Sequence, residues 1–266
     1  MAADTSIDMS LWQGRTDPEP DSDRWHQRIE PLANNAVPGC ALLGFESDAG
    51  VARNQGRTGA AEGPNALRRA LAPLAWHRTA PAYDAGNVRC VDDGLEAAQQ
   101  ALADRLTSLL TAGHLPIVLG GGHEVAYSSW LGLAQFFMPE GPDSKNIASK
   151  EHVSKTAPPR IGIINLDAHF DLRDPAHIRS SGTPFAQIAD KCQEWDWSFR
   201  YACLGVSRAA NTRALFTRAA ALGTLVREDR EIDALRLDSI VRDMQRFIAK
   251  CDHLYLTIDL DVLPAA

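Results

Sequence analysis

The stretch "NLDAHFD" places Asp167, His169 and Asp171 at alternate positions. In an extended backbone alternate side chains point to the same face, so these three side chains would lie together. Two carboxylates and an imidazole on one face match the ligands of a divalent cation. A solvated turn after a strand gives the same pattern, so the motif taken alone leaves both interpretations open.

Two further apolar runs are also followed by polar residues. His123 and Glu124 follow "LPIVLG", and Asp259 and Asp261 follow "LYLTI". If the strand ends meet at one sheet edge, the carboxylates of four aspartates converge there, and their repulsion raises their pKa values and destabilises the fold. These are Asp167, Asp171, Asp259 and Asp261. Two divalent cations remove this conflict, with a charge of +4 against −4, and His123 and His169 bring the protein ligands to six.

The composition of this ligand set indicates the metal and its chemistry. A set rich in oxygen, poor in nitrogen and without sulfur favours Mn²⁺ over Zn²⁺. Two such ions can bridge a water molecule and acidify it, which supplies a hydroxide nucleophile near neutral pH. The sequence therefore predicts hydrolysis at an electrophilic carbon or phosphorus.

The elements that would position these residues alternate along the chain. Continuous apolar runs, typical of strands buried on both faces, occur at residues 40–45, 115–120, 160–166, 201–206 and 253–258. Segments with apolar residues at helical spacing occur between them, at residues 64–75, 94–113, 124–137, 211–223 and 231–251. This alternation predicts an α/β fold with a mainly parallel sheet covered by helices on both faces. In such folds, sites form beyond the carboxyl ends of the strands.

The composition narrows the class of protein. The chain has 266 residues, a net charge of −7 and no basic stripe, which argues against nucleic acid or an anionic membrane as a partner. Its apolar runs fall short of the roughly 20 residues that span a bilayer, and the acidic N-terminus does not resemble a secretory signal. Five cysteines without a C-x-x-C pair predict reduced thiols in a cytoplasmic protein.

The motifs "GGGHE", "NLDAHFD", "SGTPF" and "LTIDLD", in this order, resemble the metal motifs of the ureohydrolase family, which includes arginase, agmatinase and formimidoylglutamase. The resemblance implies a three-layer α/β/α fold and two Mn²⁺ per chain. Carried over by motif, one ion takes His123, Asp167, Asp171 and Asp259. The other takes Asp167, His169, Asp259 and Asp261, so that Asp167 and Asp259 bridge the pair.

Several details are most similar to the formimidoylglutamase branch of the family. These are "GGGHE", "SGTPF", "DLDVLPAA" and the opening "LWQGRTDPE", and Ser181 stands where arginases and agmatinases carry a histidine. This branch implies hydrolysis of N-formimidoyl-L-glutamate to L-glutamate and formamide, a step of histidine degradation, by a metal-bridging hydroxide. The alternatives are an agmatinase or another guanidino-compound hydrolase, and a truncated, non-catalytic metal-binding homologue.

The resemblance also suggests roles around the metals. Asp171 would return a proton to the leaving amine. Arg57, in a glycine-rich loop that resembles the first active-site loop of the family, would bind a carboxylate of the small acidic substrate. Asn54, Glu124 and Thr183 would add hydrogen bonds to the substrate. Arg57 as a solvated loop residue and Glu124 as an acid at a helix N-terminus are the alternative interpretations.

The domain organisation expected from the resemblance is a single ureohydrolase-like domain over residues 1–266. Family domains normally continue beyond the D-x-D motif with further sheet and helices. The domain is therefore expected to lack its C-terminal part. The sequence leaves open whether the protein forms a homo-oligomer.

Overall fold

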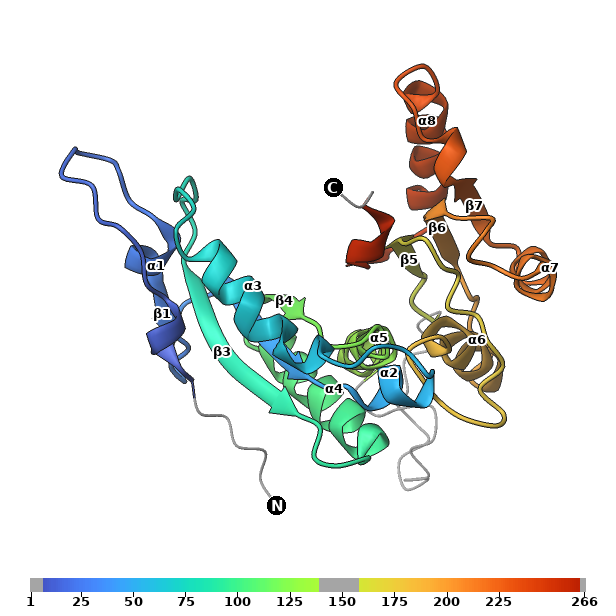
Figure 1. Ribbon diagram of the computed structural model, residues 1–266, viewed down its shortest axis with the longest axis horizontal. Helices are drawn as coiled ribbons and strands as arrows, with labels where there is room; N and C mark the ends of the chain where they lie inside the picture. The colour runs from blue at the N-terminus through green and yellow to red at the C-terminus, as the bar shows by residue number, and fades with distance from the viewer. Residues whose placement is uncertain (1–6, 139–157, 264–266) are drawn as a thin grey trace, which may run out of the picture. The chain divides into compact units, whose positions relative to one another are not determined.

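The computed structural model describes residues 7–138 and 158–263, and the chain divides into two compact units, residues 1–136 and 137–266. Each unit contains a four-stranded sheet, and every pair of neighbouring strands is parallel (Figure 1). This arrangement confirms the predicted α/β class. The expectation of one domain over residues 1–266 stays a prediction.

The first unit has the strand order β1-β3-β2-β4. Its strands are β1 (Ile29–Pro31), β2 (Cys40–Glu46), β3 (Ala82–Arg89) and β4 (Leu115–Leu119). Its helices are α1 (Trp25–Arg28), α2 (Ala49–Arg53), α3 (Gly63–Leu71), α4 (Leu95–Thr111) and α5 (Val125–Phe137), with the short 3₁₀ helices η1 (Met9–Leu11) and η2 (Ala60–Glu62).

The central strand β2 of this unit is buried along its whole length because helices cover both sheet faces. Leu43 and Phe45 point to the face where they pack with Leu102 of α4. Cys40 and Leu42 point to the opposite face, towards Leu67 of α3. The continuous apolar run in the sequence follows directly from this burial on both sides.

The second unit has the strand order β7-β6-β5-β8. Its strands are β5 (Ile161–Leu166), β6 (Tyr201–Val206), β7 (Leu225–Glu228) and β8 (His253–Ile258). Its helices are α6 (Pro184–Glu194), α7 (Arg213–Ala221) and α8 (Leu237–Ile248), with the 3₁₀ helices η3 (Asp229–Glu231) and η4 (Leu260–Val262).

Helices also pack on both faces of the second sheet. Ile240 of α8 packs with Leu204 and Ile164 on one face. Phe185 of α6 stacks on Tyr201 on the other, with ring centroids 4.5 Å apart. The neighbouring strands β5 and β8 are paired so that their last residues, Leu166 and Ile258, are partners. The segments that follow these two strands therefore start side by side.

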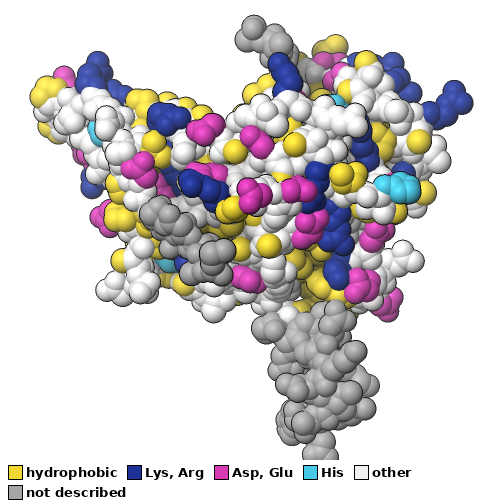
Figure 2. Space-filling view, turned by 60° about the horizontal axis from the view of Figure 1, so that its bottom comes forward, with side chains coloured by type: hydrophobic (Ala, Val, Ile, Leu, Met, Phe, Trp, Pro, Cys, Tyr) yellow, Lys and Arg dark blue, Asp and Glu magenta, His cyan; other side chains and the backbone are white. Residues whose placement is uncertain are grey.

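The surface carries charges of both signs. On the face drawn in Figure 2, the side chains of Lys and Arg are interspersed with those of Asp and Glu. Within the part of the chain that the structure describes, no helix combines the length and the apolar character needed to cross a membrane.

Candidate metal centre

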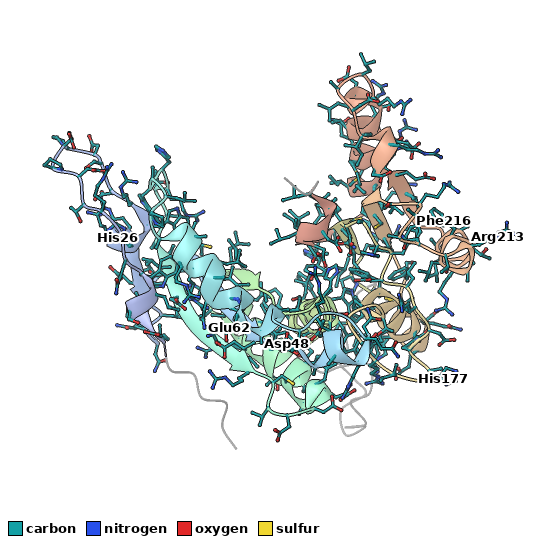
Figure 3. The ribbon with its side chains drawn as sticks, viewed as in Figure 1. His26, Asp48, Glu62, His177, Arg213 and Phe216 are labelled. Atoms are coloured by element: carbon teal, nitrogen blue, oxygen red, sulfur yellow. The ribbon has the colours of Figure 1, made fainter. Side chains whose placement is uncertain are left out.

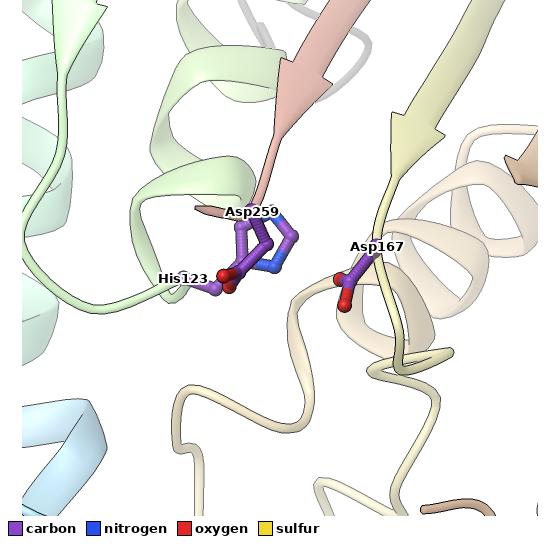
Figure 4. A group of neighbouring side chains, drawn as sticks. All are labelled: His123, Asp167 and Asp259. Atoms are coloured by element: carbon purple, nitrogen blue, oxygen red, sulfur yellow. The ribbon is translucent and has the colours of Figure 1, made fainter. Parts of the chain in front are cut away.

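The carboxyl ends of β5 and β8 bring two aspartates together within the second unit. Asp167 follows β5 and Asp259 follows β8 (Figure 4). The backbone N–H of Asp259 donates to the carbonyl of Leu166 at 2.9 Å, which extends the strand pairing by one step. A carboxylate oxygen of Asp167 lies within 4.8 Å of one of Asp259. Two acids held this close would repel each other unless a cation or a proton lies between them.

A second group adds an imidazole and another carboxylate to Asp167. Ligand atoms of Asp167, His169 and Asp261 all lie within 4.8 Å of one another. His169 Nδ1 lies 2.9 Å from Asp261 Oδ2 and 3.6 Å from Asp167 Oδ1. Asp261 is held in η4, where its N–H donates to Asp259 Oδ1 at 3.1 Å. The two strand ends thus form one acidic cluster with His169 inside it.

The electrostatics of this cluster suit a cation. The nearby carboxylates of Asp167, and then of Asp261, raise the pKa of the His169 imidazole to about 10. The imidazole is therefore protonated at neutral pH when no metal competes with the proton. The donor set contains carboxylate oxygens and an imidazole nitrogen, which fits a hard divalent ion such as Mn²⁺. The residues present therefore fit the metal that the sequence predicts.

Asp171 lies beyond this three-residue group. It has a backbone φ of 47°, in the left-handed region that non-glycine residues rarely adopt. Its negative charge contributes to the raised pKa of His169, which shows that the two side chains interact. Such strained residues cluster at functional sites. The predicted roles of Asp171, as a metal ligand and as the group that returns a proton, stay predictions.

His123 belongs to the first unit, where it lies between β4 and α5 and is 9% exposed. Three glycines, at positions 120–122, precede His123 in the sequence. Gly121 packs so closely against backbone atoms of Phe45 and Ser47 that a Cβ would not fit. The backbone before His123 is thus fixed against β2. Its role as a metal ligand stays a prediction from the motif.

Glu124 is fully buried in the first unit. Its Oε1 accepts hydrogen bonds from Ser47 Oγ at 2.8 Å and from the N–H of Gly50 at 3.0 Å. Burial raises the pKa of this carboxyl group. A Cβ on Gly50 or Gly122 would collide with the carboxyl group, which explains the two glycines. A substrate contact through Oε1 would compete with these hydrogen bonds, and that predicted contact remains untested.

The other predicted substrate-binding residues have different surroundings. Arg57 is exposed, and none of the ion pairs found among the described residues involves it. Asn54 is half-buried and ends α2. Thr183 is buried, and its hydroxyl donates to the carbonyl of Ser180 and accepts from Gln187 Nε2. The substrate-binding roles of Arg57, Asn54 and Thr183 all stay predictions.

Four buried side chains beneath the ligands were not indicated by the sequence: Asn165, Tyr201, Cys203 and Asn211. All hydrogen-bond to the segment 167–170. Of these four, only Asn165 could have been recognised from the sequence, because it is a polar residue inside the apolar run "IGIINL". Tyr and Cys inside a buried strand are ordinary core residues by composition.

Residues 38–266 match the sequence profile of the arginase family. A formimidoylglutamase of Aeromonas hydrophila is 51% identical over 265 residues, which cover 98% of this chain and 78% of that protein. The structure of formimidoylglutamase from Bacillus subtilis superposes with a TM-score of 0.74 at 19% identity, over 94% of this chain and 73% of that one. A Trypanosoma cruzi formiminoglutamase solved with Mn²⁺ gives a TM-score of 0.67 at 23% identity, over 84% and 70%. The chain belongs to the arginase family.

Proposed function

We propose that this chain hydrolyses N-formimidoyl-L-glutamate to L-glutamate and formamide. The observation that carries the proposal is the cluster of Asp167, His169, Asp259 and Asp261, found in a chain about half identical to proteins named formimidoylglutamase. The reaction breaks the C–N bond between the formimidoyl carbon and the glutamate nitrogen and adds the elements of water.

The metal is proposed to be a pair of Mn²⁺ ions. His123, Asp167, Asp171 and Asp259 would hold one ion, and Asp167, His169, Asp259 and Asp261 the other. Support comes from the acidic cluster at the ends of β5 and β8 and from the Mn²⁺ in the T. cruzi relative. When bound, such ions act as Lewis acids and lower the pKa of a coordinated water.

The protein side chains would then bind the substrate and move protons. Asp171 is proposed to return a proton to the amine of the departing glutamate, since amines leave only when protonated. Arg57 is proposed to bind a substrate carboxylate, because its guanidinium group is exposed and suits an anionic substrate better than a cationic one such as agmatine. Asn54, Glu124 and Thr183 are proposed to complete the substrate contacts.

The setting proposed for this activity is histidine degradation in the cytoplasm. All five cysteines lie in described parts of the chain, and all are free thiols, which suits a reducing compartment. The proposed partner is the small acidic substrate itself, without nucleic acid or membrane. Association of copies of the chain is also proposed.

The proposed function is tested by product identification. The protein is incubated with Mn²⁺ and N-formimidoyl-L-glutamate, and separately with agmatine and with arginine. We expect L-glutamate and formamide from the first substrate and no urea from the other two. Ammonia with N-formylglutamate would contradict the assigned bond cleavage, and urea would assign the chain to the guanidino hydrolases.

A further inference from the structure

The segment Ala168–Phe170 lies between Asp167 and Asp171, two of the proposed metal ligands, and its carbonyl groups are hydrogen-bonded by buried side chains. Each of its three carbonyl groups accepts a hydrogen bond from a different side chain. Asn211 Nδ2 donates to the carbonyl of Ala168 at 2.8 Å. Cys203 Sγ donates to that of His169 at 3.3 Å, and Tyr201 Oη to that of Phe170 at 3.0 Å.

The three donors are buried and are themselves fixed. Tyr201 and Cys203 are 2% and 0% exposed and lie at alternate positions of β6, so both point to the same face of the sheet. Asn211 follows β6 and is 7% exposed. Its Nδ2 also donates to the carbonyl of Ser207 at 2.8 Å, and its Oδ1 accepts from the N–H of Phe170 at 3.1 Å.

The same network reaches Asp167 itself. Asn165 Nδ2 donates to Asp167 Oδ2 at 2.9 Å and to Tyr201 Oη at 3.0 Å. The N–H of His169 donates to Asp167 Oδ1 at 2.7 Å. Both carboxylate oxygens of Asp167 are therefore oriented by groups that the network holds. Tyr201 links the two halves of the network, since it accepts from Asn165 and donates to Phe170.

We propose that Tyr201, Cys203, Asn211 and Asn165 are positioning residues that fix Asp167 and His169 in their ligand geometry before a metal binds. The inference rests on the metal centre in the proposed function. A segment that is ordered in the metal-free protein loses little conformational entropy when the ion binds. Partners of this kind, one step removed from a metal, change metal affinity by roughly 10- to 100-fold when they are removed.

The test measures Mn²⁺ binding to the full chain, without substrate, by titration followed with electron paramagnetic resonance. Tyr201→Phe removes the linking hydroxyl and leaves the ring stacked on Phe185. We expect its Mn²⁺ affinity to fall about tenfold and the signal of two spin-coupled ions to weaken. Tyr83→Phe is the matched control, because Tyr83 is also buried on a strand and its hydroxyl makes no hydrogen bond among the described residues.

Cys203 provides a conservative pair for the same titration. Cys203→Ala removes the donor to the His169 carbonyl, whereas Cys203→Ser replaces it with a hydroxyl donor. We expect Cys203→Ser to bind Mn²⁺ more tightly than Cys203→Ala, by about threefold for one weak hydrogen bond of about 0.6 kcal/mol. Thermal unfolding of each metal-free variant reports its stability separately.

The result that would overturn the proposal is wild-type Mn²⁺ affinity in Tyr201→Phe and in Cys203→Ala, whatever their thermal stability. A fall in unfolding temperature alone would mean that the network only stabilises the fold. A different result would contradict the proposed function: the wild-type chain would bind two ions but leave N-formimidoyl-L-glutamate uncleaved. The two outcomes are distinguishable because the titration contains no substrate.

Discussion

Arg68 of α3 and Asp84 of β3 form a buried ion pair between the helix and the strand. Both residues are 1% exposed, and Arg68 Nε and Nη2 donate to the two carboxylate oxygens at 2.7 and 2.9 Å. Trp12 Nε1 and the N–H of Gly86 also donate to this carboxylate. Each carboxylate oxygen of Asp84 therefore accepts two hydrogen bonds, which offsets much of the cost of burying its charge.

Replacing Arg68 by Met should destabilise the protein strongly, since the Asp84 carboxylate would remain buried without its cation. We expect a loss of about 3–5 kcal/mol in the free energy of unfolding, measured by urea denaturation. Arg69→Met is the matched control, because Arg69 is its exposed neighbour on α3, and should change stability by less than about 0.5 kcal/mol. Equal stabilities of the two variants would contradict this role of the ion pair.

The thiol of Cys192 gives a prediction about alkaline pH. Cys192 is 3% exposed on α6, and burial raises the pKa of its thiol to about 12 from an ordinary 9.0. Above pH 9 the unfolded chain loses this proton while the folded protein keeps it. The folded state then binds more protons, so stability falls as pH rises from about 9 towards 12.

Cys192→Ser removes this titration and keeps the size of the side chain. We expect the stability of the wild-type protein to fall by about 1 kcal/mol more than that of Cys192→Ser between pH 8 and pH 10. Urea denaturation at both pH values measures the difference. Parallel pH profiles for the two proteins would show that the thiol ionises equally in both states.

The segment from Ser47 to η2 contains α2 and a loop, and hydrogen bonds of Asp48 and Glu124 hold it in place. Asp48, at the start of α2 (Figure 3), accepts hydrogen bonds from the N–H of Gly59 at 2.9 Å and of Ala61 at 3.1 Å. Gly59 has a φ of 123°, which only glycine adopts without strain. Glu124 fixes the other end at Gly50. The exposed Arg57 is thus presented by an ordered loop.

Removing the Asp48 carboxylate should loosen this loop and weaken substrate binding. If Arg57 binds a substrate carboxylate, Asp48→Ala should raise KM for N-formimidoyl-L-glutamate about tenfold and leave kcat within about twofold, because the lost contact is made before and during the reaction alike. Glu62→Ala is the control, since Glu62 is exposed in the same segment and its side chain does not cap the helix (Figure 3). A fall in kcat with KM unchanged would contradict the role assigned to the loop.

The elements also show which parts of the fold the sequence could predict. All five predicted strands are present. The expected burial on both faces is found for β2 and β6 but is wrong for β4 and β8, where Leu115 and Leu256 are exposed because both strands lie at the edges of their sheets. The strand β3 was missed because Asp84 and Asn87, which bind Arg68, interrupt its apolar run. The helix α8 begins at Leu237, later than the predicted start at 231, because Asp233 caps an intervening turn with its carboxylate.

The sequence likewise predicted one part of the candidate site and missed another. Strand-end reasoning located Asp167, His169 and Asp261, because parallel strands deliver their carboxyl ends to one edge. The network beneath them depends on which buried side chains of β6 meet the carbonyl groups of the segment Ala168–Phe170. That depends on the pairing of β5 with β6, in which Asn165 is the partner of Cys203. Apolar patterning does not specify this register when both faces are buried.

At the scale of the whole molecule, the second sheet has one face that is only partly covered. Ile164 and Leu166 of β5 pack under Ile240 of α8. Their partners on β8, Leu256 and Ile258, point to the same face but are 58% and 54% exposed. Exposed rows of apolar side chains on an edge strand favour association between chains.

We therefore expect copies of this chain to self-associate in solution and to bind a dye specific for apolar surface. Leu254, Leu256 and Ile258 form the exposed row of β8. Leu256→Lys places a charge in its middle, where pairing would bury it, and should shift sedimentation towards the monomer and lower dye fluorescence. Leu235→Lys removes a leucine that is 95% exposed but lies outside the strands, so it should leave sedimentation unchanged. A wild-type chain that remains monomeric at high concentration, or an equal effect of both substitutions, would show that the β8 row does not drive association.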